Sequence, residues 1–148
     1  MKCDTNRNGF TLIEVMVVIV ILAMLAAIVG PKLMGRTDDA KIKTTRIQLK
    51  GLESALKFYK LDNGVYPSTE QSLNALVIKP TVGVIPKSYK EGGYLDNNSK
   101  TVPKDAWDND FIYVSPGEHG DYDLFSYGAD GAKGGDGKNA DITSWDAK

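Results

Sequence analysis

The chain contains 148 residues, with 18 basic and 19 acidic side chains and a formal net charge of −1. The 117 residues after Pro31 are enough for one compact domain with a hydrophobic core, but too few for two. The single cysteine, Cys3, precedes a long apolar stretch. A single cysteine excludes a disulfide framework within the chain. A lipidated cysteine at a signal-peptide cleavage site would follow the apolar stretch, so the position of Cys3 does not fit that role.

The apolar stretch covers residues 10–29, follows Gly9 and contains one charged side chain, Glu14. A helix of this length covers about 30 Å, the thickness of a bilayer's hydrocarbon core, so the stretch is predicted to span a membrane. It is too long for a secretory signal, and no A-x-A-like cleavage site follows it. The nine preceding residues are mildly basic, which keeps them cytoplasmic and exports the rest of the chain. A carboxylate in such a segment costs about 2.5–3.5 kcal/mol, so Glu14 indicates a partner charge as well as anchoring.

The string Gly9-Phe10-Thr11-Leu12-Ile13-Glu14, followed by an unbroken apolar run, resembles the type III signal of type IV pilins and pseudopilins. The resemblance implies that a prepilin peptidase cleaves between Gly9 and Phe10 and methylates the new amino group of Phe10. Inside a filament, Glu14 would then neutralise the N-terminal ammonium of a neighbouring subunit, where an unpaired charge is costly. A plain signal anchor with an incidental glutamate is the alternative.

Beyond this stretch, apolar residues recur at helical spacing and predict an amphipathic helix over residues 37–61, which ends at Asn63-Gly64. Gly30-Pro31 lies between the two helical halves. Because proline removes one backbone hydrogen bond and clashes with the preceding turn, it predicts a kink or local melting rather than a full break.

Charge is unevenly distributed along the chain. Residues 32–60 hold eight Lys or Arg against three acids, whereas residues 91–148 hold twelve acids against five Lys. The basic residues favour a solvated helix face over phospholipid or nucleic-acid contacts, since they lie on the exported side and are spread around a helix. Attraction to the acidic head of another copy, which would favour ordered assembly, is a third interpretation.

The part of the chain after the long helix predicts a small mixed domain. A capping-box pattern at Ser68 to Gln71, followed by apolar residues at one-face spacing, predicts a short helix that ends near Ile78. Residues 79–103 form an irregular excursion that is long enough to be functional. Residues 111–115 and 122–127 predict an antiparallel hairpin. The predicted fold class is α+β, with a long N-terminal helix, kinked near Pro31, that packs on a small antiparallel sheet.

Three strings in this domain are similar to the major pseudopilin of bacterial type II secretion systems. They are residues 59–71, Asp105-Ala106-Trp107-Asp108 and Ser115-Pro116-Gly117-Glu118-His119-Gly120. The similarity covers nearly the whole chain after the leader and implies a pilin-like fold. A typical type IV pilin would end with a disulfide-closed loop, and this chain lacks the cysteines for one.

The loop at residues 127–141 has little apolar content and would lack order unless something closed it. Its aspartates and glycines offer carboxylates and inward-turned backbone carbonyls, the oxygen ligands of which calcium takes six to eight. The spacing does not match the EF-hand string, so a merely soluble turn rich in Asp and Gly is the alternative.

The resemblance implies one structural calcium ion in this loop, with Asp130 and Asp141 as side-chain ligands and Tyr127 as a carbonyl ligand. In many relatives a second acid precedes the last aspartate. Here that position is Ala140, so the corresponding calcium ligand would be the carbonyl of Ala140 or the carboxylate of Asp136. The ion would take over the cross-linking role of disulfides and couple the stability of the head to calcium supply.

No pattern in the chain indicates an enzyme. His119 is the only histidine and lies in a turn rich in Pro and Gly. No nucleophile elbow, zinc-binding helix motif or phosphate-binding glycine loop occurs in the sequence. Trp107 and Trp145 suggest a membrane-anchored, calcium-dependent binding module for glycans or secreted proteins, but packing against the head is favoured.

The resemblance implies a domain plan and a function. Residues 1–9 form the leader, residues 10–30 the membrane and filament-core helix, and residues 31–148 the periplasmic head. The mature chain would cross the inner membrane once and then polymerise into a periplasmic pseudopilus that drives folded proteins across the outer membrane. Its partners would be other copies of itself, the prepilin peptidase, minor pseudopilins and the inner-membrane platform, with no nucleic acid. A type IV pilin or a minor pilin-like subunit of a surface fibre is the alternative.

Overall fold

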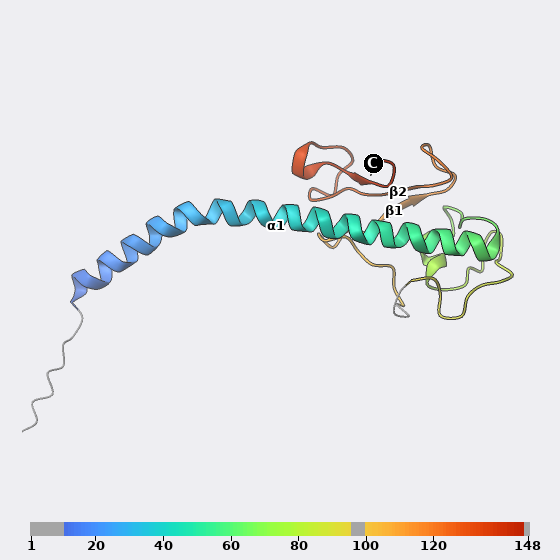
Figure 1. The fold of residues 1–148 in the computed structure, drawn as a ribbon, viewed down its shortest axis with the longest axis horizontal. Helices are drawn as coiled ribbons and strands as arrows, with labels where there is room; N and C mark the ends of the chain where they lie inside the picture. Colours follow the sequence, from blue (N-terminus) through green and yellow to red (C-terminus); the bar gives the residue numbers. More distant parts are fainter. Residues whose placement is uncertain (1–10, 96–99, 147–148) are drawn as a thin grey trace, which may run out of the picture. The chain divides into compact units, whose positions relative to one another are not determined.

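The computed structural model describes residues 11–95 and 100–146, with the side chains of residues 29–36 left out of the description (Figure 1). The chain divides into two compact units, Met1–Thr37 and Asp38–Lys148. The first unit carries the apolar stretch, and the second is the head.

One helix, α1, runs from Leu12 to Asn63. A reciprocal pair of hydrogen bonds forms its start: the backbone N of Glu14 donates to Thr11 Oγ1 (3.3 Å), and the backbone N of Thr11 donates to Glu14 Oε2 (3.4 Å). This is the arrangement of a capping box. The helix continues without interruption through Pro31, so no full break occurs there, and the predicted kink stays a prediction.

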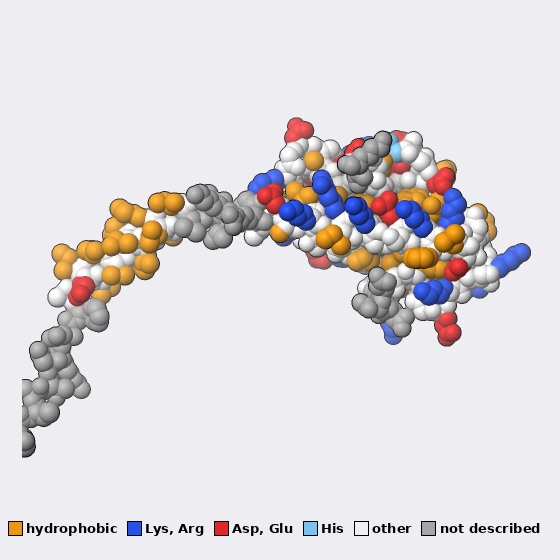
Figure 2. Space-filling model, in the orientation of Figure 1, with side chains coloured by type: hydrophobic (Ala, Val, Ile, Leu, Met, Phe, Trp, Pro, Cys, Tyr) orange, Lys and Arg blue, Asp and Glu red, His pale blue; other side chains and the backbone are white. Residues whose placement is uncertain are grey.

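Apolar side chains surround α1 on every face in its first part. The large apolar residues from Leu12 to Ile28 are 46–80% exposed, and they cover this segment in the space-filling view (Figure 2). Among the residues whose side chains are described, no helix is both long enough and apolar enough to cross a membrane. The predicted span at residues 10–30 includes positions outside that description and stays a prediction.

In the head, α1 buries one side and exposes the other. Thr45, Leu49, Leu52, Leu56 and Tyr59 are at most 2% exposed. Because they recur at intervals of three or four residues, they form one stripe along the helix. Basic side chains form a row on the face of α1 seen in Figure 2. The helix predicted for residues 37–61 is thus the C-terminal part of α1.

The sheet of the head has three short antiparallel strands in the order β1-β2-β3. They are β1 (Ile112–Val114), β2 (Asp123–Ser126) and β3 (Ile142–Thr143). Each strand contributes one buried apolar residue, Tyr113, Leu124 and Ile142 respectively, to the same hydrophobic core as the buried stripe of α1. The predicted hairpin is confirmed as β1 and β2. The sequence did not indicate β3, because a strand of two residues after an Asp-rich loop has no alternating pattern.

The short helix predicted from Ser68 to about Ile78 is wrong in type and extent. The structure has a 3-10 helix, η1, at Leu73–Leu76. The capping-box hydrogen bonds do form, from Ser68 N to Gln71 Oε1 (3.0 Å) and from Gln71 N to Ser68 Oγ (3.3 Å). Ser72 then takes a positive φ of 52°, which no α-helix allows, and so the turn does not continue as an α-helix.

Candidate metal site in the C-terminal loop

The Asp/Gly loop, defined here as residues 127–141, leaves β2 and returns as β3. Ser126, the last residue of β2, pairs with Ile142, the first residue of β3. This antiparallel register brings the two ends of the loop together, so that Tyr127 and Asp141 directly follow and precede paired residues. The sheet thereby closes a 15-residue loop.

Glycines determine the path of the loop. Gly128 has a φ of +68°, and a Cβ atom there would lie 3.0 Å from the carbonyl oxygen of Ala140. At Gly135, φ is +87° and a Cβ atom would lie 2.3 Å from the carbonyl oxygen of Asn139. Only glycine tolerates such close approaches of backbone oxygens at a positive φ. A short 3-10 helix, η3 (Gly137–Asn139), precedes the return to the sheet.

Asp141 is the carboxylate best placed to hold a cation. Its Oδ2 accepts a hydrogen bond from the backbone N of Gly134 (3.0 Å), which ties it across the loop. Its Oδ1 is buried and has no hydrogen-bond partner among the described residues. A buried carboxylate oxygen without a partner costs free energy, and a bound cation would satisfy it. Carboxylate oxygens are ligands that calcium takes, so the chemistry of this oxygen fits a calcium ligand.

In the described part of the chain, the other predicted aspartate ligands, Asp130 and Asp136, are not tied across the loop as Asp141 is. Asp130 Oδ1 accepts a hydrogen bond from the backbone N of Ala132 (3.1 Å) and stays exposed. Asp136 precedes η3 without a capping hydrogen bond from its side chain. Within residues 11–95 and 100–146, no group of three or more His, Cys, Asp or Glu side chains could hold a metal ion. A cation in this loop would therefore need backbone carbonyls, such as those of Tyr127 and Ala140, as well as aspartates.

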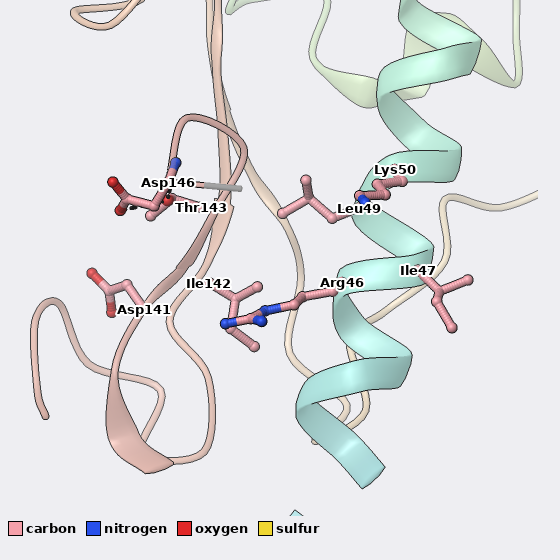
Figure 3. A pocket seen from close by; sticks show the side chains of 8 residues that line it. All are labelled: Arg46, Ile47, Leu49, Lys50, Asp141, Ile142, Thr143 and Asp146. Atoms are coloured by element: carbon pink, nitrogen blue, oxygen red, sulfur yellow. Dashed lines mark hydrogen bonds between the residues drawn. The ribbon is translucent and has the colours of Figure 1, made fainter. Parts of the chain in front are cut away.

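A cavity of about 280 Å³ lies between the end of this loop and α1 (Figure 3). Asp141 and Asp146 line it from the side of β3, and Arg46 and Lys50 line it from the helix. The loop is also tied to the helix by an ion pair between Lys138 Nζ and Asp38 Oδ2 (3.2 Å). Acidic and basic groups thus face each other across the same opening.

The two tryptophans are parts of packed clusters. Trp145 stacks on the ring of His119, with centroids 4.1 Å apart and planes 3° apart, and meets Phe125 edge-on at 5.7 Å. Trp107 is partly buried and packs against the hydrophobic core. Both arrangements agree with the packing interpretation.

Asp123 is the acceptor that organises the turn between β1 and β2. Its carboxylate accepts hydrogen bonds from the backbone N atoms of Glu118 (2.9 Å) and His119 (3.0 Å), and His119 Nδ1 lies 3.1 Å from Oδ2. Burial by itself raises the pKa of Asp123, but these hydrogen bonds outweigh burial and lower the pKa below its ordinary value. The ionised carboxylate therefore stabilises the folded head.

This pKa shift predicts a specific loss of stability in acid. A lowered pKa in the folded state means that the contribution of Asp123 is complete above pH of about 4 and is lost as the pH falls through the folded value. We expect the free energy of unfolding to fall more steeply below pH of about 4 for the wild type than for Asp123→Asn. Urea unfolding at a series of pH values measures this, with Asp110→Asn, at an 83% exposed carboxylate, as the control. Parallel pH curves for the wild type and Asp123→Asn would contradict the assignment.

The predicted N-terminal processing residues, Gly9 and Phe10, lie outside the described residues. Glu14 is described and exposed, and it forms the capping box with Thr11. Its proposed counterion would come from another subunit, so a single chain does not test that role.

Comparison with known proteins places the chain in a family. The model of the family "Type II secretion system (T2SS), protein G" matches residues 32–145, and that of the "Prokaryotic N-terminal methylation motif" matches residues 4–30. The chain belongs to the type II secretion system protein G family. It is 50% identical to the type II secretion system core protein G of Vibrio cholerae, over 98% of this chain and 96% of that protein. It is also 50% identical to the core protein G of Pseudomonas aeruginosa, over 95% of this chain and 96% of that protein.

A solved structure agrees with this membership. The crystal structure of the major pseudopilin from the type 2 secretion system of enterohaemorrhagic Escherichia coli matches with a TM-score of 0.67 and 40% identity, over 78% of this chain and 92% of that chain. The resemblance to the major pseudopilin and the pilin-like α+β fold are therefore confirmed. A pseudopilin is a structural subunit, so the family also confirms the prediction that the chain is not an enzyme.

Proposed function

We propose that this chain is the major pseudopilin of a type II secretion system, which polymerises into a periplasmic helical filament and drives folded proteins across the outer membrane. The observation that carries the proposal is the order of the two family matches. A methylation motif at residues 4–30 is followed at once by the protein G domain at residues 32–145. The first provides the means of processing and assembly, and the second provides the head that the filament displays.

The exposed apolar helix supports the assembly step. Its side chains from Leu12 to Ile28 face outward on all sides in the single chain. Such a surface needs lipid before assembly and neighbouring helices afterwards. Contacts between copies that do not close into a ring produce a fibre. The proposed location is the inner membrane, crossed once, with the head in the periplasm until the subunit enters the pseudopilus.

The N-terminus provides the direct test of the proposal. Mass spectrometry of the protein purified from its own host is expected to find a mature chain that begins with N-methylated Phe10. A variant with a bulky residue at position 9, Gly9→Val, is expected to keep the leader. Position 9 lies directly before the cleaved bond, so the larger side chain would obstruct binding to the prepilin peptidase. An uncut and unmethylated N-terminus in the wild type would contradict the proposal. The expected partners are further copies of the chain, the prepilin peptidase, minor pseudopilins and the inner-membrane platform.

We further propose that the Asp/Gly loop holds one calcium ion, with Asp130, Asp141 and the carbonyl of Tyr127 as ligands. The carbonyl of Ala140 or the carboxylate of Asp136 would complete the set. The buried Oδ1 of Asp141, which has no hydrogen-bond partner in the part of the chain that the structure describes, supports the site, as does the glycine-directed path of the loop. When bound, the ion would supply a cross-link among groups that are far apart in the loop, and so stabilise the head.

A further inference from the structure

Four residues close a buried ring of hydrogen bonds beneath the Asp/Gly loop. We call Asp105, Asn109, Ser126 and Gly128 the Asp105 ring. Ser126 Oγ donates to Asp105 Oδ2, and the backbone N of Gly128 donates to Ser126 Oγ (3.0 Å). Asn109 closes the ring twice, since its Nδ2 donates to the carbonyl of Gly128 (3.1 Å) and its backbone N donates to Asp105 Oδ1 (2.8 Å). Asp105 is 6% exposed and Ser126 is fully buried.

The ring determines the orientation of the peptide group between Tyr127 and Gly128. A trans peptide is planar, and its N–H and C=O point in opposite directions. Because the N–H of Gly128 is held on Ser126 Oγ, the carbonyl of Tyr127 must point away from the ring. Asn109 holds the next carbonyl, that of Gly128, on its amide nitrogen. Of these two consecutive carbonyls, the one belonging to Tyr127 is therefore directed away from the hydrogen-bond donors of the ring.

The ring is itself anchored to the long helix. The backbone N of Ala106, the residue after Asp105, donates to Thr45 Oγ1 (3.1 Å), and Thr45 is fully buried on α1. Asp105 Oδ1 also accepts from the backbone N of Trp107 (2.9 Å). The Asp105 ring, together with the neighbouring Ala106, thus links three segments that are far apart in the sequence: the helix, β2 and the start of the Asp/Gly loop.

We infer that the Asp105 ring positions the Tyr127 carbonyl for calcium, and that Asp105, Ser126 and Asn109 set the affinity of the loop without touching the ion. This inference rests on the calcium site proposed above. Groups that orient a metal ligand typically change metal affinity by about 10- to 100-fold when they are removed. A residue that only stabilised the fold would instead leave the affinity of the folded protein unchanged.

Ser126→Ala tests the ring with the loss of a single hydroxyl group and no change of charge. Ser144→Ala is the matched control, because Ser144 Oγ also accepts a backbone hydrogen bond, from the N of Leu124 (3.4 Å), but lies outside the ring. The full-length chain in detergent micelles is titrated with calcium by calorimetry, well below the melting temperature measured in EDTA. We expect the calcium Kd to rise by about 10- to 100-fold in Ser126→Ala and to stay close to the wild-type value in Ser144→Ala.

Asn109→Ala provides a second test if Ser126→Ala fails to fold. Asn109 is only partly buried, and the substitution keeps its backbone bond to Asp105 while it removes the bond to the Gly128 carbonyl. A similar loss of calcium affinity is expected. A wild-type Kd in a folded ring variant, even one with a lower melting temperature in EDTA, would overturn the inference. Absence of calcium binding by the wild type would overturn the proposed calcium site as well, so the two failures are distinguishable.

Discussion

Glu14→Gln is expected to abolish filament assembly and protein export while insertion and cleavage of the chain continue. In the proposed filament, Glu14 is the counterion of the N-terminal ammonium of a neighbouring Phe10. Removal of one partner of a buried ion pair costs about 3–5 kcal/mol, because the other charge stays buried and unpaired. At about 1.4 kcal/mol per tenfold, each subunit contact would weaken by more than about a hundredfold.

The structure makes glutamine the substitution of choice. Glu14 Oε2 accepts a hydrogen bond from the backbone N of Thr11, and the amide oxygen of glutamine can accept the same bond. Glu14→Gln therefore removes the charge and keeps the capping box. Thr11→Val is the complementary control, because it removes the hydroxyl that accepts from Glu14 N but keeps the carboxylate.

Electron microscopy of fibres and export of a folded substrate measure assembly, and mass spectrometry of the N-terminus measures cleavage. Thr11→Val is expected to assemble, since loss of one cap costs about 1 kcal/mol of helix stability and leaves the Glu14 carboxylate in place. Normal fibres from Glu14→Gln would refute the role of Glu14 as a counterion. If neither variant assembled, the defect would instead arise from a disturbed start of the helix.

Removal of calcium is expected to lower the melting temperature of the head. An ion present at a thousand times its Kd stabilises the folded state by about 4 kcal/mol. For a protein of this size, 1 kcal/mol corresponds to about 2–4 °C, so EDTA should lower the melting temperature by about 8–16 °C. Circular dichroism or calorimetry of the full-length chain, with and without added calcium, measures the shift.

Asp141→Asn identifies the site of this effect. The amide oxygen of asparagine can keep the bond from Gly134 N, but it is a weaker calcium ligand than a carboxylate oxygen. The variant is expected to melt at about the temperature of the wild type in EDTA and to respond little to calcium. Asp146→Asn is the control, because Asp146 lies in the same cavity wall but is hydrogen-bonded to Thr143 Oγ1 (2.8 Å), outside the loop. A full calcium response in Asp141→Asn would place the ion elsewhere.

Local patterns were sufficient to predict several elements of the head. The buried stripe from Leu49 to Tyr59 follows from helical spacing, and the β1–β2 hairpin follows from two apolar runs around a Pro/Gly turn. The capping box at Ser68 predicted its two hydrogen bonds correctly but not the helix after it. Gln71 Nε2 instead donates to the carbonyls of Val82 (2.7 Å) and Val84 (3.0 Å), contacts with a loop that no local pattern contains.

The sequence by itself determined the family, the processing motif and the type of ligand that the C-terminal loop can offer. Each of these depends on residues that are neighbours in the chain, so their chemistry can be read from spacing. Only the tertiary structure decided that Asp141 keeps a buried oxygen with no hydrogen-bond partner among the described residues, and that Ser126 donates a hydrogen bond to Asp105, 21 residues away in the sequence. Those contacts arise when β2, β3 and α1 bury a common core, and burial across such distances leaves no periodic pattern in the chain.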